Sequence, residues 1–292
     1  AGTTLAPLLG QSECTVTKRL PGAPPAVCAA LAHCGAAVRA HAANLLAACA
    51  ARGIQAIPRG APGYPALLVA RLGQDAPLLL FIRGSTALFE KCGVGIVGTR
   101  SPSAKGVHWA AACAREAVAQ GAAVVSGGAA GVDWAAHCAA LEAGGLTVAA
   151  LPEGLLAARV APPLAEAVER GAAVLLSEAP PDASWETHRA VARNRLIAAL
   201  SQAVCVVEPR KHGGSLCTAR WGLAQGVPVY IGGAATGILH KYTGAGSLAC
   251  AQDGALERQL HAAVKAGTIR LPLQELLPTL ESGGLRSDIP AS

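Results

Sequence analysis

The sequence predicts a doubly wound α/β fold with a mostly parallel sheet and a small helical appendage at its N-terminus. Three observations carry this prediction. Short segments that are apolar throughout recur between residues 93 and 232, helix-like stretches of about ten to fifteen residues separate them, and glycine-rich turns follow several of the strands. Strands that are apolar on both faces are typical of a parallel sheet with helices on each side.

The first 52 residues are expected to form the small helical region, because an alanine-rich, helix-like stretch over 26–52 follows a proline-rich start. The main domain is expected over 53–255. It opens with a lead-in segment whose prolines and glycines divide it into short pieces before the strand-like LLLFI at 78–82, and we expect this segment to pack on the domain. Residues 256–292 are expected to hold one helix and a polar tail.

From Gly93 onward, strand-like and helix-like segments alternate regularly. The expected strands are GVGIVG (93–98), AAVVSG (122–127), LTVAAL (146–151), AAVLLSE (172–178), AVCVVE (203–208) and VPVYIG (227–232). The expected helices are Ala104–Gln120, Val132–Ala143, Pro163–Arg170, Asn194–Ser201 and Leu216–Gln225. This order is that of a Rossmann-like fold, in which ligands bind beyond the carboxyl ends of the strands.

The composition limits the classes of function. A net charge of +6 permits a polyanionic partner without requiring one. Aromatic residues make up 3% of the chain, which weighs against base-stacking modules, so any nucleic-acid contact is expected to rest on phosphates. Ten cysteines without a C-x-x-C pair indicate reduced thiols and a cytoplasmic protein. No signal peptide is expected, because the N-terminus lacks a basic-then-apolar pattern, and no membrane span is expected, because the chain has no apolar run of about 18 residues.

The first candidate site is the turn after the 93–98 strand, with Gly98, Thr99, Arg100 and Ser101. Free backbone N–H groups before a helix, together with a guanidinium group, suit a phosphate. The alternative is a plain strand-to-helix turn with a surface arginine. NAD is not expected as a cofactor, because the glycines lie in the strand rather than in a G-x-G-x-x-G turn.

A second glycine-rich turn follows the next strand and holds Ser126, Gly127, Gly128, Gly131 and Asp133. Glycines allow a ligand to approach the backbone closely. The alternative makes Asp133 a helix-capping residue. His137, four residues further on the same helical face, is expected to be a packing histidine, since too few other ligands lie nearby for a metal site.

Charged residues gather further along the chain. Glu178 follows a strand end and is a candidate to hold a ribose hydroxyl, a base edge or an arginine, Arg193 or Arg195 included. Arg193, Asn194 and Arg195 are expected to open a helix, which is the wrong end for cations because the helix dipole is positive there. An anion bound by both arginines would offset that cost, so this segment favours phosphate recognition.

A last turn combines glycines and hydroxyl groups with basic neighbours: Lys211, His212, Gly213, Gly214, Ser215 and Thr218. No Ser-His-Asp set and no cysteine with a nearby base can be assembled from the spacing. The sequence therefore predicts a binding site rather than a catalytic one, with no cofactor and no metal.

An ordered set of motifs extends from about Tyr64 to Ala255. The motifs are YPALL with APLLLFIRG, GIVGTRSPSAKG, SGGAAGVDWAAHCAAL, LLSEAP, RNRLIAALSQAVCVVE, GGSLCTARWGLAQGVPVYI, and GSL with DGA. In this order and spacing they resemble the DprA/Smf family of DNA-processing proteins.

The resemblance implies an extended Rossmann fold that binds single-stranded DNA without being an enzyme. It also implies a homodimer that helps to load a RecA-type recombinase during natural transformation. Carried over by position, Arg100, Arg193 and Arg195 would bind phosphates, while Ser126, Gly127, Gly131 and Asp133 would shape the pocket.

The chain departs from the family pattern at three places. Ala130 stands where S-G-x-A-R-G-x-D has arginine, and Ala190 with Val191 stands where a Phe-Pro pair is expected. Arg159 and Val160 replace the Tyr-Pro of G-L-D-x-x-Y-P. These changes concern the part of the pocket that would contact bases.

Two other classes of function stay open. A nucleotide-binding sensor or phosphoribohydrolase-like enzyme would use a related fold, although residues 213–218 lack the P-G-G-x-G-T signature of such hydrolases. A diverged interaction protein that kept the fold and lost the ligand is the third class, and Ala130 favours it.

Overall fold

The fold is that of a computed structural model, which describes residues 9–19, 25–210 and 213–232. The chain divides into two compact units, residues 1–52 and 53–292. The helix and tail expected over 256–292 lie outside the described residues, as do Lys211 and His212.

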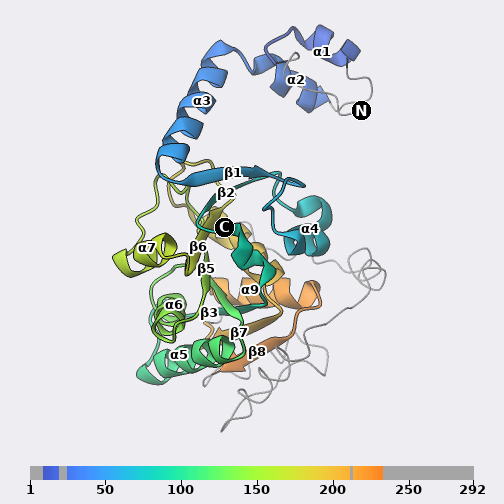
Figure 1. The fold of residues 1–292 in the computed structure, drawn as a ribbon. Helices are drawn as coiled ribbons and strands as arrows, with labels where there is room; N and C mark the ends of the chain where they lie inside the picture. The colour runs from blue at the N-terminus through green and yellow to red at the C-terminus, as the bar shows by residue number, and fades with distance from the viewer. Residues whose placement is uncertain (1–8, 20–24, 211–212, 233–292) are drawn as a thin grey trace. The chain divides into compact units, whose positions relative to one another are not determined.

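In its described residues, the smaller unit holds the helices α1 (Glu13–Arg19), α2 (Pro25–His33) and α3 (Ala36–Ala51) (Figure 1). The helix-like stretch over 26–52 is thus two helices. Val16 of α1 and Cys28 of α2 form a small core. The Arg39 guanidinium of α3 donates to the carbonyl oxygens of Leu9 at 3.1 Å and Cys34 at 3.0 Å.

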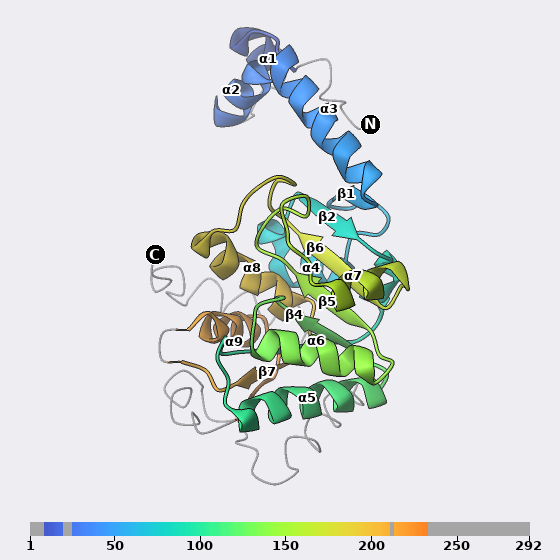
Figure 2. The same cartoon turned by 90° about the vertical axis from the view of Figure 1, so that its left-hand side faces the viewer.

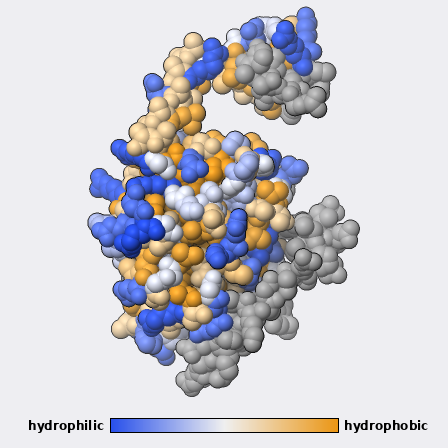
Figure 3. Space-filling model, viewed as in Figure 1, coloured by the Kyte–Doolittle hydropathy of each residue, from blue (hydrophilic) through white to orange (hydrophobic). Residues whose placement is uncertain are grey.

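Most of α3 is exposed alanine, so its surface is mainly pale orange in Figure 3. No single helix in the described ranges is both long and apolar enough to cross a membrane. Helices α2 and α3 meet that test of length and composition only when taken together, and they are bent by 81° at their break.

The larger unit is built on an eight-stranded sheet in the order β1-β2-β6-β5-β4-β3-β7-β8. The strands are β1 (Ile54–Pro58), β2 (Leu79–Arg83), β3 (Gly93–Gly98), β4 (Ala123–Ser126), β5 (Thr147–Ala150), β6 (Ala173–Ser177), β7 (Ala203–Val207) and β8 (Val229–Gly232). The six strands from β3 to β8 are parallel, whereas β1 and β2 add an antiparallel edge beside β6. The doubly wound, mostly parallel fold is therefore confirmed, and the lead-in segment joins the sheet itself.

Helices cover both faces of this sheet (Figures 1 and 2). One face carries α4 (Ala66–Leu72), α8 (Thr187–Ala199) and α9 (Gly214–Ala224), and the other carries α5 (Ala104–Ala119), α6 (Val132–Glu142) and α7 (Pro162–Glu169). Short 3-10 turns, η2 (Gly73–Asp75) and η3 (Thr86–Glu90), flank β2. Leu68, Leu196 and Leu216 fill the core on the first face, and Ile96 and Cys113 pack on the second.

The strand order reverses at β3. The chain runs from β3 through β4 and β5 to β6 in one direction, and β7 and β8 then lie on the opposite side of β3. In open parallel sheets such a reversal leaves a crevice beyond the carboxyl ends of the two strands concerned, here β3 and β7, and this is the usual ligand site.

One expected helix boundary is wrong, and it matters for function. Helix α8 begins at Thr187, not at Asn194, so Arg193 lies at its middle, Arg195 lies in its second half, and neither opens a helix. The buried face of α8 includes Arg193 and Asn194 beside Leu196 and Ile197. Residues 187–192 of this helix are exposed or half-buried, so no apolar period marks its start in the sequence. The helix-dipole argument for an anion at these arginines therefore falls.

Candidate functional site

The turn after β3 connects three elements at the carboxyl edge of the sheet. The Thr99 amide donates to the Val207 carbonyl of β7 at 3.3 Å, and the Thr99 carbonyl accepts from the Val132 amide of α6 at 3.2 Å. The Ser101 amide donates to the buried Thr99 hydroxyl at 3.2 Å. These bonds hold the turn at the reversal point, and they leave the Arg100 side chain exposed.

The N-terminus of α5 already holds a carboxylate from the protein. Ser103 donates its amide to Glu208 Oε2 at 2.9 Å and its hydroxyl to Glu208 Oε1, and that hydroxyl accepts from the Gly106 amide at 3.1 Å. Glu208 follows β7 and has a positive φ of 46°, which is uncommon outside glycine and often marks a functional or constrained site. The helix N-terminus that the sequence offers to a phosphate is thus occupied by Glu208, so the cation of Arg100 is what this turn presents to a ligand.

The second glycine-rich turn packs against the first. Gly131 has a φ of +84°, and a Cβ there would lie 2.5 Å from the Thr99 carbonyl oxygen. Gly127 has no room for a side chain either, because a Cβ would overlap the Arg193 guanidinium. The Ser126 hydroxyl is buried and donates to the Ile96 carbonyl of β3 at 2.5 Å. These residues therefore shape the edge of the sheet without offering a polar group to solvent, while Gly128 is exposed.

Asp133 and Arg193 form a buried pair of opposite charges behind this turn. The Asp133 carboxylate accepts from the amides of Gly127 at 3.2 Å and Ala129 at 3.4 Å. Burial raises the pKa of Asp133, and the positive charge of Arg193 opposes that shift. Asp133 lies in the first turn of α6, but the N-cap of this helix is Gly131, without a side-chain cap hydrogen bond. The carboxylate bonds amides of the loop before the helix instead, so the helix-capping alternative is wrong.

The Arg193 side chain is 6% exposed and donates to the Ala150 carbonyl at the end of β5. Burial lowers its pKa, whereas the carboxylates of Asp133 and Glu153 raise it. Within the described ranges, Arg193 Nε and Glu153 Oε2 are buried polar atoms without a hydrogen-bond partner. Sequence reasoning missed Glu153, whose only signal was a position just after a strand end.

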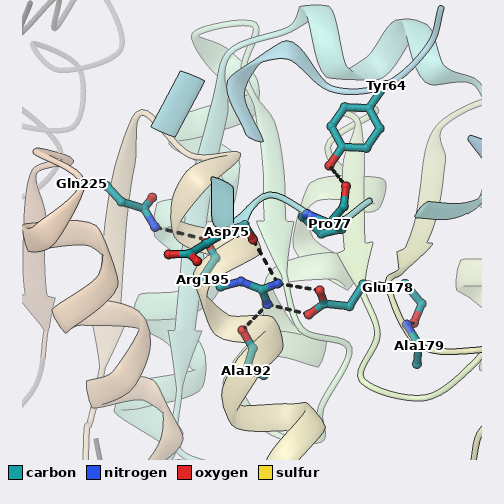
Figure 4. Close-up of polar contacts among 9 residues, drawn as sticks. Tyr64, Asp75, Pro77, Glu178, Ala179, Ala192, Arg195 and Gln225 are labelled. Atoms are coloured by element: carbon teal, nitrogen blue, oxygen red, sulfur yellow. Dashed lines mark hydrogen bonds and ion pairs between the residues drawn. The ribbon is translucent and has the colours of Figure 1, made fainter. Parts of the chain in front are cut away.

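Arg195 holds three segments together (Figure 4). Its guanidinium forms a two-pronged ion pair with Glu178, with N–O distances of 2.5 and 2.6 Å, and also donates to the carbonyls of Ala192 at 2.9 Å and Asp75 at 3.4 Å. Gln225, the residue after α9, donates to the Arg195 carbonyl at 3.3 Å. Of the partners considered for Glu178, the structure selects Arg195, and the charge of this arginine is balanced inside the protein.

Tyr64, in the lead-in segment, lies close enough to Glu178 and Arg195 for their charges to act on its pKa. Its hydroxyl donates to the Pro77 carbonyl at 2.7 Å (Figure 4), and burial raises the pKa of Tyr64 to about 12. Tyr64 therefore stays protonated and acts as a structural donor.

Arg100 lies over the ring of Trp185, with its guanidinium carbon 5.5 Å from the ring centroid. Trp185 is 47% exposed and comes from the loop between β6 and α8. In the described part of the chain Arg100 has no ion pair. Sequence reasoning missed Trp185, because a single aromatic residue in a loop has no periodicity. Only the structure shows that its ring is exposed at the edge of the sheet.

The last turn contributes little to the exposed surface. Ser215 and Thr218 are buried in α9, and the Asn194 amide of α8 donates to the Gly214 carbonyl at 3.0 Å. His137 is also buried, and its Nδ1 lies 2.7 Å from the Thr147 hydroxyl, which donates to the Val124 carbonyl. Burial lowers the pKa of His137 to about 4, as the packing interpretation requires. The ranges that the structure describes contain no group of three acidic, histidine or cysteine residues placed to hold a metal.

Comparison with known proteins gives consistent results. The family model of DNA recombination-mediator protein A matches residues 55–263. The DNA processing protein DprA of Bacillus subtilis is 35% identical over 215 residues, which cover 73% of this chain and 70% of the relative. Protein Smf of Escherichia coli is 36% identical over 180 residues, which cover 60% of this chain and 46% of that protein.

Two solved structures share the fold. DNA processing protein A of Streptococcus pneumoniae superposes with a TM-score of 0.59 at 26% identity, covering 84% of this chain and 91% of that one. DNA processing protein A of Helicobacter pylori, described for its single-stranded DNA binding mode, superposes with a TM-score of 0.52 at 25% identity. The match covers 78% of this chain and 95% of that one. The resemblance seen in the motifs is confirmed, and the chain belongs to the DNA recombination-mediator protein A family, the DprA/Smf proteins.

Proposed function

We propose that this chain is a single-stranded DNA-binding protein of the DprA type, and that DNA lies along the carboxyl edge of the sheet at the reversal between β3 and β7. The observation that carries the proposal is the exposed, unpaired guanidinium of Arg100 on the turn after β3, in the described part of the chain. Single-stranded DNA binding by the Helicobacter pylori relative supports the same ligand class.

The predicted site residues divide into two roles under this proposal. Arg100 contacts a phosphate directly, because its charge is free and exposed. Arg193 and Arg195 position the edge of the sheet, since each is engaged with carbonyl or carboxylate groups of the protein. The glycine and hydroxyl residues of the turns give the edge its shape: Gly98, Thr99, Ser101, Ser126, Gly127, Gly131, Gly214, Ser215 and Thr218.

Family membership extends the proposal to partners. We infer a homodimer that hands single-stranded DNA to a RecA-type recombinase in the cytoplasm, as part of DNA processing in natural transformation. We infer a role in binding rather than catalysis, because the sequence offers no nucleophile with a nearby base among the residues of this edge.

A small-nucleotide sensor or hydrolase is the less favoured class. Such a protein would use the helix N-terminus at the reversal point for a phosphate, and here Glu208 occupies the N-terminus of α5. A nucleotide phosphate would have to displace that carboxylate.

The test is fluorescence anisotropy with labelled single-stranded and duplex oligonucleotides across a salt series. We expect tighter binding to single strands, and the Arg100→Ala variant should lower the log–log salt slope by about 0.7, the value for one lost phosphate contact on a single strand. Arg170→Ala is the matched control, because Arg170 is an exposed arginine that precedes β6 at the opposite edge of the sheet. Absence of binding at low salt would contradict the proposal, and an unchanged slope for Arg100→Ala would assign this arginine a structural role.

A further inference from the structure

We propose that Trp185 is a stacking platform for one base of the bound strand, next to the phosphate that Arg100 contacts. This inference rests on the proposed function and goes beyond it, because it assigns base contact to a residue outside the family motifs. It also reverses the expectation, drawn from the 3% aromatic content, that contact would rest on phosphates alone.

Exposure is the first argument. Trp185 is 47% exposed, although an indole ring is large and usually finds a place in a core. It is also the one aromatic residue among the large apolar side chains that lie exposed in the described ranges. An exposed tryptophan at a binding edge supplies a wide flat surface at a small cost in side-chain entropy.

Position beside a cation is the second argument. The Arg100 guanidinium lies 5.5 Å from the Trp185 ring centroid, a distance at which cation and ring attract each other. Single-stranded nucleic acid alternates phosphates and bases, and proteins that bind it combine cations for the backbone with aromatic rings for the bases. Arg100 and Trp185 place one group of each kind side by side.

The loop that carries Trp185 is held in place, which is the third argument. The Gly154 amide donates to the Ala183 carbonyl at 2.9 Å, two residues before Trp185. The Arg189 guanidinium donates to the Ser184 carbonyl at 2.9 Å and pairs with Glu186 at 3.3 Å. Both neighbours of Trp185 thus bond to Arg189, and a platform whose loop is restrained before binding loses less entropy when a base stacks on it.

The experiment compares a labelled oligothymidine with an abasic oligonucleotide of equal length, bound to wild type, Trp185→Ala and Trp185→Phe. The wild type should prefer the oligothymidine. Trp185→Ala should weaken oligothymidine binding about five- to 150-fold, the range for loss of one base–aromatic stack. It should weaken abasic binding less, by about two- to fivefold at most, through loss of the Arg100–Trp185 contact. Trp185→Phe should retain most of the preference, because it keeps an aromatic face.

The outcomes separate the two proposals. If the wild type binds neither oligonucleotide, the proposed function fails and this inference with it. If the wild type binds and Trp185→Ala keeps the full preference for bases, the platform is refuted while DNA binding stands. If Trp185→Ala weakens the binding of both oligonucleotides equally and lowers the salt slope as Arg100→Ala does, then Trp185 only positions Arg100. The base contact is again refuted in that case.

Discussion

Arg100 and Arg193 lie near the same edge of the sheet, yet their environments are opposite. Arg100 is exposed, lies over an indole ring and has no ion pair in the described residues, whereas Arg193 is 6% exposed, faces Asp133 and donates to a strand carbonyl. A charge in water is available to a ligand, but a buried charge must first be satisfied by the protein. Two arginines that the motifs present as equivalent are thus expected to contribute differently, one to binding and the other to stability.

The largest expected effect is that of Arg193→Ala. Removal of one partner leaves Asp133 as a buried carboxylate without its cation, which typically costs about 3–5 kcal/mol of unfolding free energy. Denaturant unfolding monitored by circular dichroism measures it, and Arg100→Ala is the matched arginine control, with a change of about 0.5 kcal/mol or less expected at an exposed site. If Arg193→Ala is as stable as the wild type and instead lowers the salt slope of DNA binding, Arg193 contributes to binding and the contrast with Arg100 is wrong.

A second test measures how stability depends on pH through His137, a buried residue that cannot contact a ligand. His137 has a folded pKa of about 4, below its ordinary value of 6.5, so the unfolded chain binds a proton that the folded protein does not bind between these pH values. Stability should therefore fall as the pH is lowered from about 6.5 to about 4, by about 3 kcal/mol in all.

His137→Gln isolates this contribution. Asp133, whose pKa is raised by burial, changes stability in the opposite direction with pH, and it does so in both proteins. The difference between wild type and variant in urea unfolding should shrink toward acid pH. A difference that stays constant with pH would show that His137 does not titrate as a buried neutral group.

The sequence predicted the fold better than it predicted the roles of site residues, and the reason is physical. The β3 strand and the turn at Thr99 and Arg100 follow local rules, since an apolar strand that ends in glycine and polar residues leaves few alternatives. Whether an arginine is exposed depends on residues far along the chain. Arg195 meets Asp75 and Glu178, and no local pattern encodes that meeting.

Arg195 gives a prediction of intermediate size, because its ion pair with Glu178 is partly exposed. The side chains are 15% and 24% exposed, and we expect about 1–3 kcal/mol of destabilisation for Arg195→Ala, in the range for hydrogen bonds to charged groups. Glu178→Gln should cost less alone and should add little to Arg195→Ala, so a double-mutant cycle measures the coupling. Full additivity of the two changes would show that the pair observed here does not contribute in solution.

Arg100→Lys carries the smallest expected effect and sharpens the comparison most. Lysine keeps the positive charge, so the salt slope of single-stranded DNA binding should stay as in the wild type. Lysine lacks the planar guanidinium that stacks on Trp185, so affinity should fall by about 0.5–1 kcal/mol. Anisotropy titrations of Arg100→Lys and Arg100→Ala in the same salt series separate these contributions: a slope that falls equally in both variants would mean that the geometry of the guanidinium, rather than its charge, makes the phosphate contact.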